Sequence, residues 1–265
     1  MPSARKRTRS YDPARTRAAV LAQFENVRAG VRALTPEQLA LPTRLGDWTV
    51  RDLVAHLALT VESVGRALER DEPAKPDLAL LDYLSATAAH ADAIAEASRE
   101  LAGATSDLDA LLTRAGQDLA RHLAAAPHTR VLAMRAGAMI LTDHLVTRAV
   151  ELVVHTDDLN AAVPGLDIPH DRQALAACTR MLADTLAAKA PGGSTEVRIP
   201  PYAVVQCVQG PRHTRGTPPN VVETDPLTWI RLATGRTTWQ DALAGGTVGA
   251  SGERADLGPY LPLMT

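Results

Sequence analysis

Residues 140–159 contain the feature that most constrains how this chain of 265 residues can fold. If they form a helix of 100° per residue, their polar side chains fall on one arc about 80° wide. These side chains are His144, Arg148, Glu151, His155 and Asp158. Leucines flank the arc on one side and valines on the other. Because a surface helix carries its polar stripe opposite its apolar face, a stripe between two apolar flanks is predicted to point into the protein.

The stripe is a candidate site because buried charges are costly unless they are paired or bind a metal. Glu151 and His155 are four residues apart, so they share one helix face and suit a divalent ion such as zinc. His56, on another expected helix, is the natural third ligand. Arg148 can orient the carboxylate or bind an anionic substrate, and Asp158 can fix the tautomer of His155. A buried ion-pair network that only fixes the helix register explains the stripe equally well.

Apolar residues spaced three and four apart predict helices over most of the first two-thirds of the chain. These helices are expected at about 13–34, 49–68, 80–101, 108–123 and 140–159. Residues 128–138 are ambiguous between strand and loop. His56 lies on the flank of its helix's apolar face, where a half-exposed histidine without a partner is the simpler interpretation of that residue alone.

After residue 160 the pattern changes to a proline- and glycine-bearing linker followed by a mixture of helix and strand. The later helices are expected at about 171–189, 227–232 and 239–243, and the strands at about 195–199, 202–208 and 247–252. The chain is therefore predicted to be mostly helical with a small α+β unit at its end. Its parts are expected to be a disordered basic tail over 1–12, a helical domain over 13–162 and an α+β domain over 170–265.

Composition excludes several classes of partner. A net charge of −2 gives no electrostatic reason to expect nucleic acid or an anionic membrane as a partner. Two cysteines in a chain of this length are no disulfide framework, so the cytoplasm is the expected compartment. No apolar run approaches the roughly 20 residues of a membrane span. We expect a monomer or a homodimer.

Two segments resemble a known family. Residues 46–57 (Gly-Asp-Trp-Thr-Val-Arg-Asp-Leu-Val-Ala-His-Leu) and 147–159 (Thr-Arg-Ala-Val-Glu-Leu-Val-Val-His-Thr-Asp-Asp-Leu) resemble the mycothiol-dependent maleylpyruvate isomerase family, which belongs to the DinB-like metal-binding bundles. The resemblance covers roughly residues 13–160 and implies an up-down four-helix bundle. It also implies that His56, Glu151 and His155 are zinc ligands, which favours the metal site over the ion-pair network.

The last third resembles a sterol-carrier-like module, which accompanies such bundles in actinobacterial proteins. The resemblance rests on residues 196–208, 223–236 and 246–253. Such a module can line an apolar pocket or cover the mouth of the bundle. The segment 211–220 contains Arg215 among polar residues and suits an anionic ligand, although a solvated loop has the same composition.

The resemblance implies an enzyme that uses zinc and a mycothiol-type thiol as cosubstrate to isomerise a small electrophile or transfer the thiol to it. We expect Arg148 and Asp158 to contribute to catalysis, and Arg148, His144 and Arg215 to bind substrate. His144 can equally be an extra ligand, a general base or a polar neighbour. The alternatives are a metal-dependent hydrolase and a non-catalytic small-molecule or lipid-binding protein that uses the C-terminal module.

Overall fold

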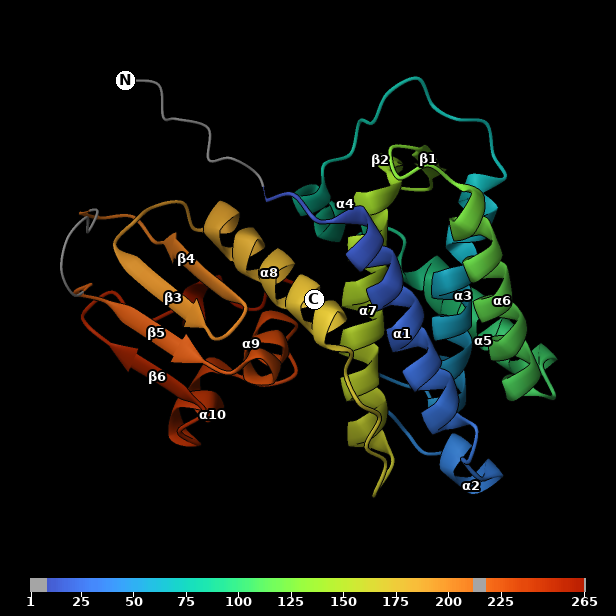
Figure 1. The fold of residues 1–265 in the computed structure, drawn as a ribbon. Coiled ribbons are helices and arrows are strands. Elements are labelled where there is room, and N and C mark those ends of the chain that lie inside the picture. The colour runs from blue at the N-terminus through green and yellow to red at the C-terminus, as the bar shows by residue number, and fades with distance from the viewer. Residues whose placement is uncertain (1–8, 212–217, 265) are drawn as a thin grey trace.

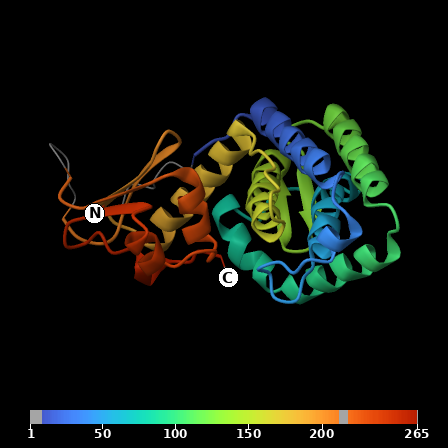
Figure 2. The same cartoon turned by 90° about the horizontal axis from the view of Figure 1, so that it is seen from below.

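Four helices enclose the core of the N-terminal region (Figure 1). The computed structural model describes residues 9–211 and 218–264. The bundle helices are α1 (Pro13–Val31), α3 (Val50–Leu68), α6 (Leu108–Ala125) and α7 (Leu141–Ala162). Helix α1 packs against α6 and α7, and α3 packs against the same two helices, so the four form a closed ring. The view from below shows this ring end-on (Figure 2).

Local sequence signals begin the first two bundle helices where they were expected. The Asp12 side chain accepts a hydrogen bond from the backbone of Arg15 and caps α1, whose first residue is Pro13. Thr49 and Asp52 form a capping box at the start of α3. The inward faces of both helices consist mostly of buried aliphatic residues and Phe24. An N-terminal cap therefore fixes where each helix begins, and burial of one apolar face holds it in the bundle.

The order of the bundle differs from the up-down connectivity that we expected. His122 near the end of α6 contacts Glu69 at the end of α3, so these two successive bundle helices run parallel. Arg17 at the start of α1 donates to Leu123 at the end of α6, so α1 and α6 run antiparallel. The reason is a further helix, α5 (Ala91–Ala104), which packs against α3 and returns the chain to the end where α3 began.

Shorter elements surround the bundle. They are α2 (Pro36–Leu39), η1 (Leu80–Asp82), α4 (Tyr83–Ala88), β1 (Val131–Met134) and β2 (Gly137–Ile140). The single helix expected over 80–101 is therefore divided into α4 and α5, with His90 at the break. The ambiguous segment 128–138 contributes to an antiparallel hairpin of β1 and β2, whose turn places Gly137 at a φ of 140°.

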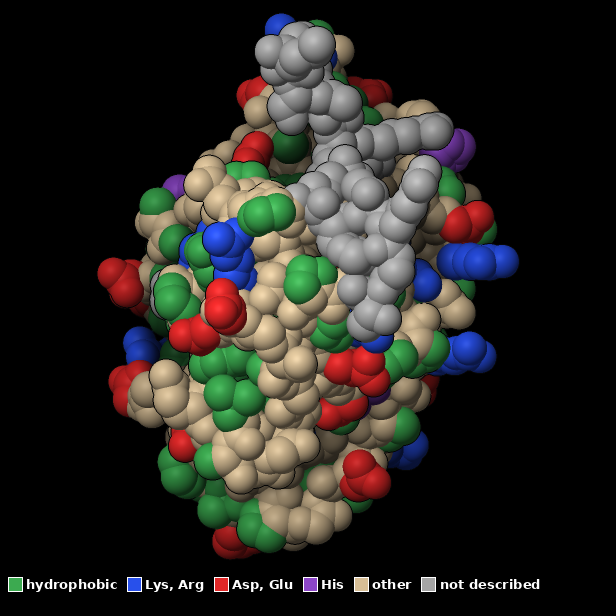
Figure 3. All heavy atoms as spheres, turned by 90° about the vertical axis from the view of Figure 1, so that its left-hand side faces the viewer, with side chains coloured by type: hydrophobic (Ala, Val, Ile, Leu, Met, Phe, Trp, Pro, Cys, Tyr) green, Lys and Arg blue, Asp and Glu red, His purple; other side chains and the backbone are tan. Residues whose placement is uncertain are grey.

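The C-terminal region is a four-stranded sheet with helices. Its elements are α8 (Arg172–Lys189), β3 (Thr195–Ile199), β4 (Ala203–Cys207), β5 (Val221–Thr224), α9 (Pro226–Ala233), α10 (Trp239–Ala244), β6 (Val248–Ser251) and η2 (Gly258–Tyr260). The strand order is β4-β3-β5-β6, with β3 and β5 parallel and the other pairs antiparallel. We did not expect β5. The side of the molecule formed by this region mixes hydrophobic, acidic and basic side chains (Figure 3).

Helix α8 connects the two regions because it packs against α1 and α7 as well as against β4 and α9. The domain boundaries at 162 and 170 stay predictions. Residues 9–12, expected to belong to a disordered tail, contact the protein instead: Arg9 forms an ion pair of 2.8 Å with Asp184 on α8, and Tyr11 packs against the core. Within the described ranges, no helix is both long and apolar enough to span a bilayer.

Candidate metal centre

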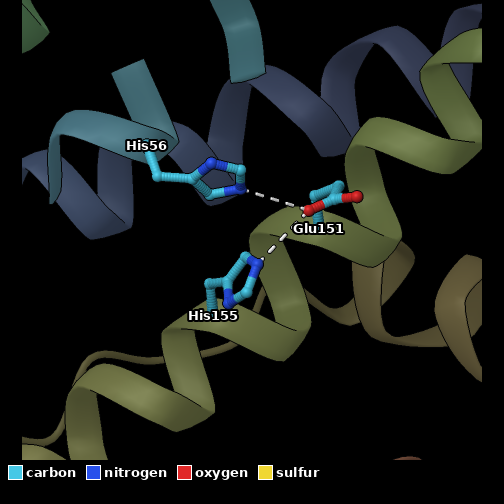
Figure 4. Close-up of side chains that lie close together, drawn as sticks. All are labelled: His56, Glu151 and His155. Atoms are coloured by element: carbon cyan, nitrogen blue, oxygen red, sulfur yellow. Dashed lines mark hydrogen bonds and ion pairs between the residues drawn. The ribbon is translucent and has the colours of Figure 1, made fainter. Parts of the chain in front are cut away.

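Two bundle helices bring three metal-binding side chains together (Figure 4). His56 extends from α3, and Glu151 and His155 extend from successive turns of α7. The Nε2 atom of His56 lies 3.4 Å from Oε2 of Glu151, and Nε2 of His155 lies 3.3 Å from the same oxygen. One donor atom from each residue lies within 4.8 Å of the other two. We call these three residues the triad.

The triad fits zinc. Zinc–ligand bonds of about 2.0–2.1 Å place two tetrahedral ligands about 3.3–3.4 Å apart, which matches the two separations from Glu151 Oε2. Two histidines and one glutamate are a ligand set that catalytic zinc sites use with the fourth position left for water or substrate. The glutamate side chain keeps 21% exposure, so solvent reaches part of the triad.

A neighbouring hydroxyl orients His56. The residue is buried, which corrects the half-exposed interpretation of it alone. Its Nδ1 atom lies 3.3 Å from Oγ of Ser98 on α5, and that hydroxyl donates its own hydrogen to the carbonyl of Ile94. In the tautomer whose Nδ1–H donates to the Ser98 oxygen, Nε2 carries no hydrogen and is free to bind a metal; in the other tautomer, Nε2–H donates to Glu151.

A buried carboxylate orients His155. Its Nδ1 atom lies 2.8 Å from Oδ2 of Asp158, whose side chain is fully buried. A carboxylate that accepts the second ring hydrogen of a ligand histidine fixes its tautomer and makes it a stronger ligand. Asp158 therefore contacts the triad through His155, and the contribution to catalysis expected of it stays a prediction.

Three arginines surround Asp158 and its neighbour Asp157. Arg44, in the loop before α3, contacts both carboxylates. Arg231 on α9 pairs with Asp157 at 2.5 Å, and Arg236 pairs with Asp158 at 2.9 Å. We call these five residues the arginine–aspartate cluster. It joins the C-terminal region to the helix that supplies two triad residues.

The stripe continues with Arg148 one turn before Glu151 and with His144 two turns before it, and both side chains are buried. The guanidinium of Arg148 donates to the hydroxyl of Tyr83 on α4, and its Nε donates to Oγ1 of Thr147 at 3.2 Å. It lies 3.9 Å from Glu151 Oε1. Nε2 of His144 has no hydrogen-bond partner among the described residues.

Burial and partners move the pKa values of the triad apart. Burial alone would raise the pKa of Glu151, but hydrogen bonds from His155 and His56 and the charge of Arg148 hold it well below its usual value. Burial lowers the pKa of His56. Burial would also lower the pKa of His155, but hydrogen bonds to Asp158 and Glu151 raise it to about 9. Without a metal, His155 is therefore protonated at neutral pH, and Glu151 is ionised.

The structure brings together all the expected site residues of the bundle: His56, His144, Arg148, Glu151, His155 and Asp158. Arg215 lies outside the described residues. The sequence interpretation missed the residues from other elements that contact the polar stripe or His56. These are Arg44, Tyr83, Ser98, Arg231 and Arg236. No spacing rule relates them to residues 140–159, because they come from loops and helices far away in the chain.

Comparisons with known proteins agree with this architecture. A crystal structure of the mycothiol-dependent maleylpyruvate isomerase superposes with a TM-score of 0.58 at 15% identity, covering 93% of this chain and 95% of that one. A histidine-to-alanine variant of that enzyme gives a TM-score of 0.59 with the same identity and coverage. At this identity the likeness establishes the fold. A comparison with curated proteins finds no match.

Two family models match the sequence itself. Residues 171–263 match the family described as bacterial SCP ortholog, which covers the C-terminal sheet and its helices. Residues 20–160 match the family described as mycothiol maleylpyruvate isomerase N-terminal domain, and this segment contains the whole triad. Since the second match covers more than half of the chain, this protein belongs to the mycothiol maleylpyruvate isomerase N-terminal domain family.

Proposed function

We propose that this protein is a zinc enzyme that uses a low-molecular-weight thiol of the mycothiol type to act on a small electrophile. The observation that carries the proposal is the triad, in which both histidine nitrogens lie at the distance from Glu151 Oε2 that a tetrahedral zinc site requires. Membership of the family supports the choice of mycothiol as the thiol. His56, Glu151 and His155 would hold the metal.

When bound at such a site, zinc lowers the pKa of a coordinating thiol, so that a thiolate is available at neutral pH. The chain's own contribution is to present the ligands in the correct state. Ser98 and Asp158 turn the Nε2 atoms of the two histidines toward the shared oxygen of Glu151. Glu151 is ionised, since its pKa is held well below the usual value.

The nucleophile must come from outside the chain. Cys178 and Cys207 are both fully buried, and burial raises the pKa of the Cys178 thiol. A buried thiol in an apolar environment stays protonated and unreactive. The thiolate of the cosubstrate would therefore attack the electrophilic carbon of the second substrate, while Arg148 holds an anionic group of that substrate beside the triad.

Two reactions are compatible with this chemistry. With a maleyl-type substrate, the new C–S bond converts the cis double bond into a single bond that rotates, and elimination of the thiol returns the trans isomer. With an electrophile whose adduct is stable, release of that adduct makes the protein an S-transferase. The family favours the isomerase. A zinc hydrolase, with water in place of the thiol, is the competing function.

The test measures metal and thiol dependence separately. Zinc content of the purified protein should be one equivalent and should be lost in His56→Ala, while His90→Ala, a change outside the triad, should retain it. Turnover of maleylpyruvate should then require added mycothiol. A wild type that binds no zinc would exclude both metalloenzyme functions, and turnover of the substrate without thiol would favour the hydrolase.

A further inference from the structure

A cavity of about 320 Å³ lies where residues 9–12 and the first turn of α1 meet α8 and the turn before β4. Its volume is at the lower end of the range of about 300–1,000 Å³ over which protein cavities hold small molecules. No residue of the triad lines it, because the triad extends from α3 and α7, and neither helix contributes to the wall of the cavity. The cavity is therefore separate from the candidate metal centre.

The wall of this cavity carries more positive than negative charge. Its described residues include three arginines, Arg9, Arg15 and Arg180, and one carboxylate, that of Asp12. The charge of Arg9 is balanced by Asp184 on α8, which lies 2.8 Å away. Neither Arg15 nor Arg180 forms an ion pair with another described residue. An excess of positive charge on a concave surface attracts anions.

The guanidinium of Arg180 is held in place with most of its donors unused. The side chain is half-buried, and its Nε atom donates to the carbonyl of Tyr202 at 3.0 Å. This bond fixes the orientation of the guanidinium and leaves its two terminal NH₂ groups without a partner among the described residues. A fixed guanidinium presents donors that match the oxygens of a carboxylate or phosphate.

Tyr11 adds an unsatisfied donor to the same wall. Its hydroxyl is buried and has no hydrogen-bond partner within the described ranges. Burial raises the pKa of Tyr11, so the hydroxyl keeps its hydrogen, and the positive charge of Arg180 is close enough to act on it. A buried donor without an acceptor costs free energy until an acceptor reaches it. An oxyanion beside Arg180 would supply that acceptor.

We propose that this cavity binds a small organic oxyanion, a metabolite that carries a phosphate or a carboxylate group. Arg180 and Arg15 bind the anionic group, and Tyr11 donates to it. The ligand is distinct from the molecules that react at the triad. Residues 9–16 precede the segment matched by the N-terminal family model, and Arg180 belongs to the segment matched by the other model. The ligand would therefore connect the start of the chain to the C-terminal region.

Calorimetric titration of the purified full-length protein with phenyl phosphate and with benzoate tests the site, and benzyl alcohol is the uncharged match. At least one of the two anions should bind, the tighter of them identifies the anionic group, and benzyl alcohol should bind far more weakly. Arg180→Gln should weaken binding of the anion roughly tenfold. Arg172→Gln, a change at an exposed arginine of α8 outside the cavity, should leave it unchanged.

A second variant and removal of the metal make the result decisive. Arg15→Gln changes an exposed side chain, so it leaves the fold intact and should weaken binding severalfold even if Arg180→Gln does not fold. Treatment with a chelator should leave the affinity for the anion unchanged, whereas loss of binding with the metal would place the anion at the triad and overturn the proposal. Absence of binding of either anion at millimolar concentration, or an affinity that neither arginine substitution changes, would also overturn it.

Discussion

The two ends of the polar stripe on α7 are both buried, but their charges are compensated to different degrees. At the C-terminal end, Asp157 and Asp158 are 5% and 0% exposed, and three arginines from other elements pair with them. Nearer the N-terminal end, Arg148 is 7% exposed and has a carboxylate only at 3.9 Å, and His144 has an unpartnered nitrogen among the described residues. The triad lies between these ends.

The difference separates a structural role from a binding role. Both aspartates of the arginine–aspartate cluster are paired with arginines, and the cluster holds His155 and joins the C-terminal region to the bundle. The surroundings of Arg148 are incomplete, and natural proteins keep such buried polar groups where a ligand completes them.

Removing the charge of Glu151 should have the largest effect, because this residue belongs to the triad and faces Arg148. Glu151→Gln keeps the size but removes the anionic ligand. It should weaken zinc binding by roughly a thousandfold, or about 4 kcal/mol, which is about a quarter to two-fifths of a site's binding free energy of about 10–16 kcal/mol. Competition with a chelator measures the affinity, and Glu62→Gln, on the surface of α3, is the control. Retained zinc affinity in Glu151→Gln would exclude the triad as the site.

Breaking the arginine–aspartate cluster should reduce stability more than removing a surface ion pair. Asp158→Asn leaves Arg236 without its buried counter-charge and Arg44 with Asp157 alone, which should lower the free energy of unfolding by about 3–5 kcal/mol. Asp184→Asn, which disrupts the partly exposed pair with Arg9, should cost about 1 kcal/mol or less. Urea denaturation of the metal-free proteins measures both, and equal losses would mean that the cluster is not a structural unit.

The same difference explains what the sequence could and could not predict. Glu151, His155 and Asp158 follow one helical period, so their common face was predictable, and with it the inward stripe. His56 required the resemblance to a family, since its own helix places it on a flank. Arg236 and Tyr83 reach the stripe through tertiary packing, which leaves no period in the sequence. The parallel course of α3 and α6 depends on α5, and a spacing pattern gives helix positions but no directions.

The C-terminal region should affect metal affinity through Arg236. Arg236→Gln removes one partner of Asp158 and leaves Arg44 in place, so His155 should be held less firmly. Loss of such an outer partner typically weakens metal binding about 10–100-fold. Arg198→Gln, on the exposed side of the sheet, is the matched control from the same region. Unchanged zinc affinity in Arg236→Gln would limit the arginine to a role in domain contact.

The pH dependence of zinc binding should be the smallest effect, counted per pH unit. It depends on the contact between Asp158, at the C-terminal end of the stripe, and His155 of the triad. Asp158 and Glu151 raise the pKa of His155 to about 9 in the metal-free protein. Zinc must therefore displace one proton from His155, whereas Glu151 is already ionised and the pKa of His56 is below its usual value. The apparent zinc affinity should rise about tenfold per pH unit from pH 7 and level off near pH 9.

The stability of the metal-free protein should change in the opposite direction. A raised pKa in the folded state means that the folded protein binds the proton of His155 more tightly than the unfolded chain does. This contribution to stability is complete below the unfolded value of about 6.5 and is lost as the pH rises through about 9. Asp158→Asn replaces the charged acceptor in the first of the two hydrogen bonds that raise the pKa of His155 with a neutral one, so both pH dependences should move to lower pH in that variant. Identical profiles in wild type and Asp158→Asn would show that the arginine–aspartate cluster does not control the protonation of the triad.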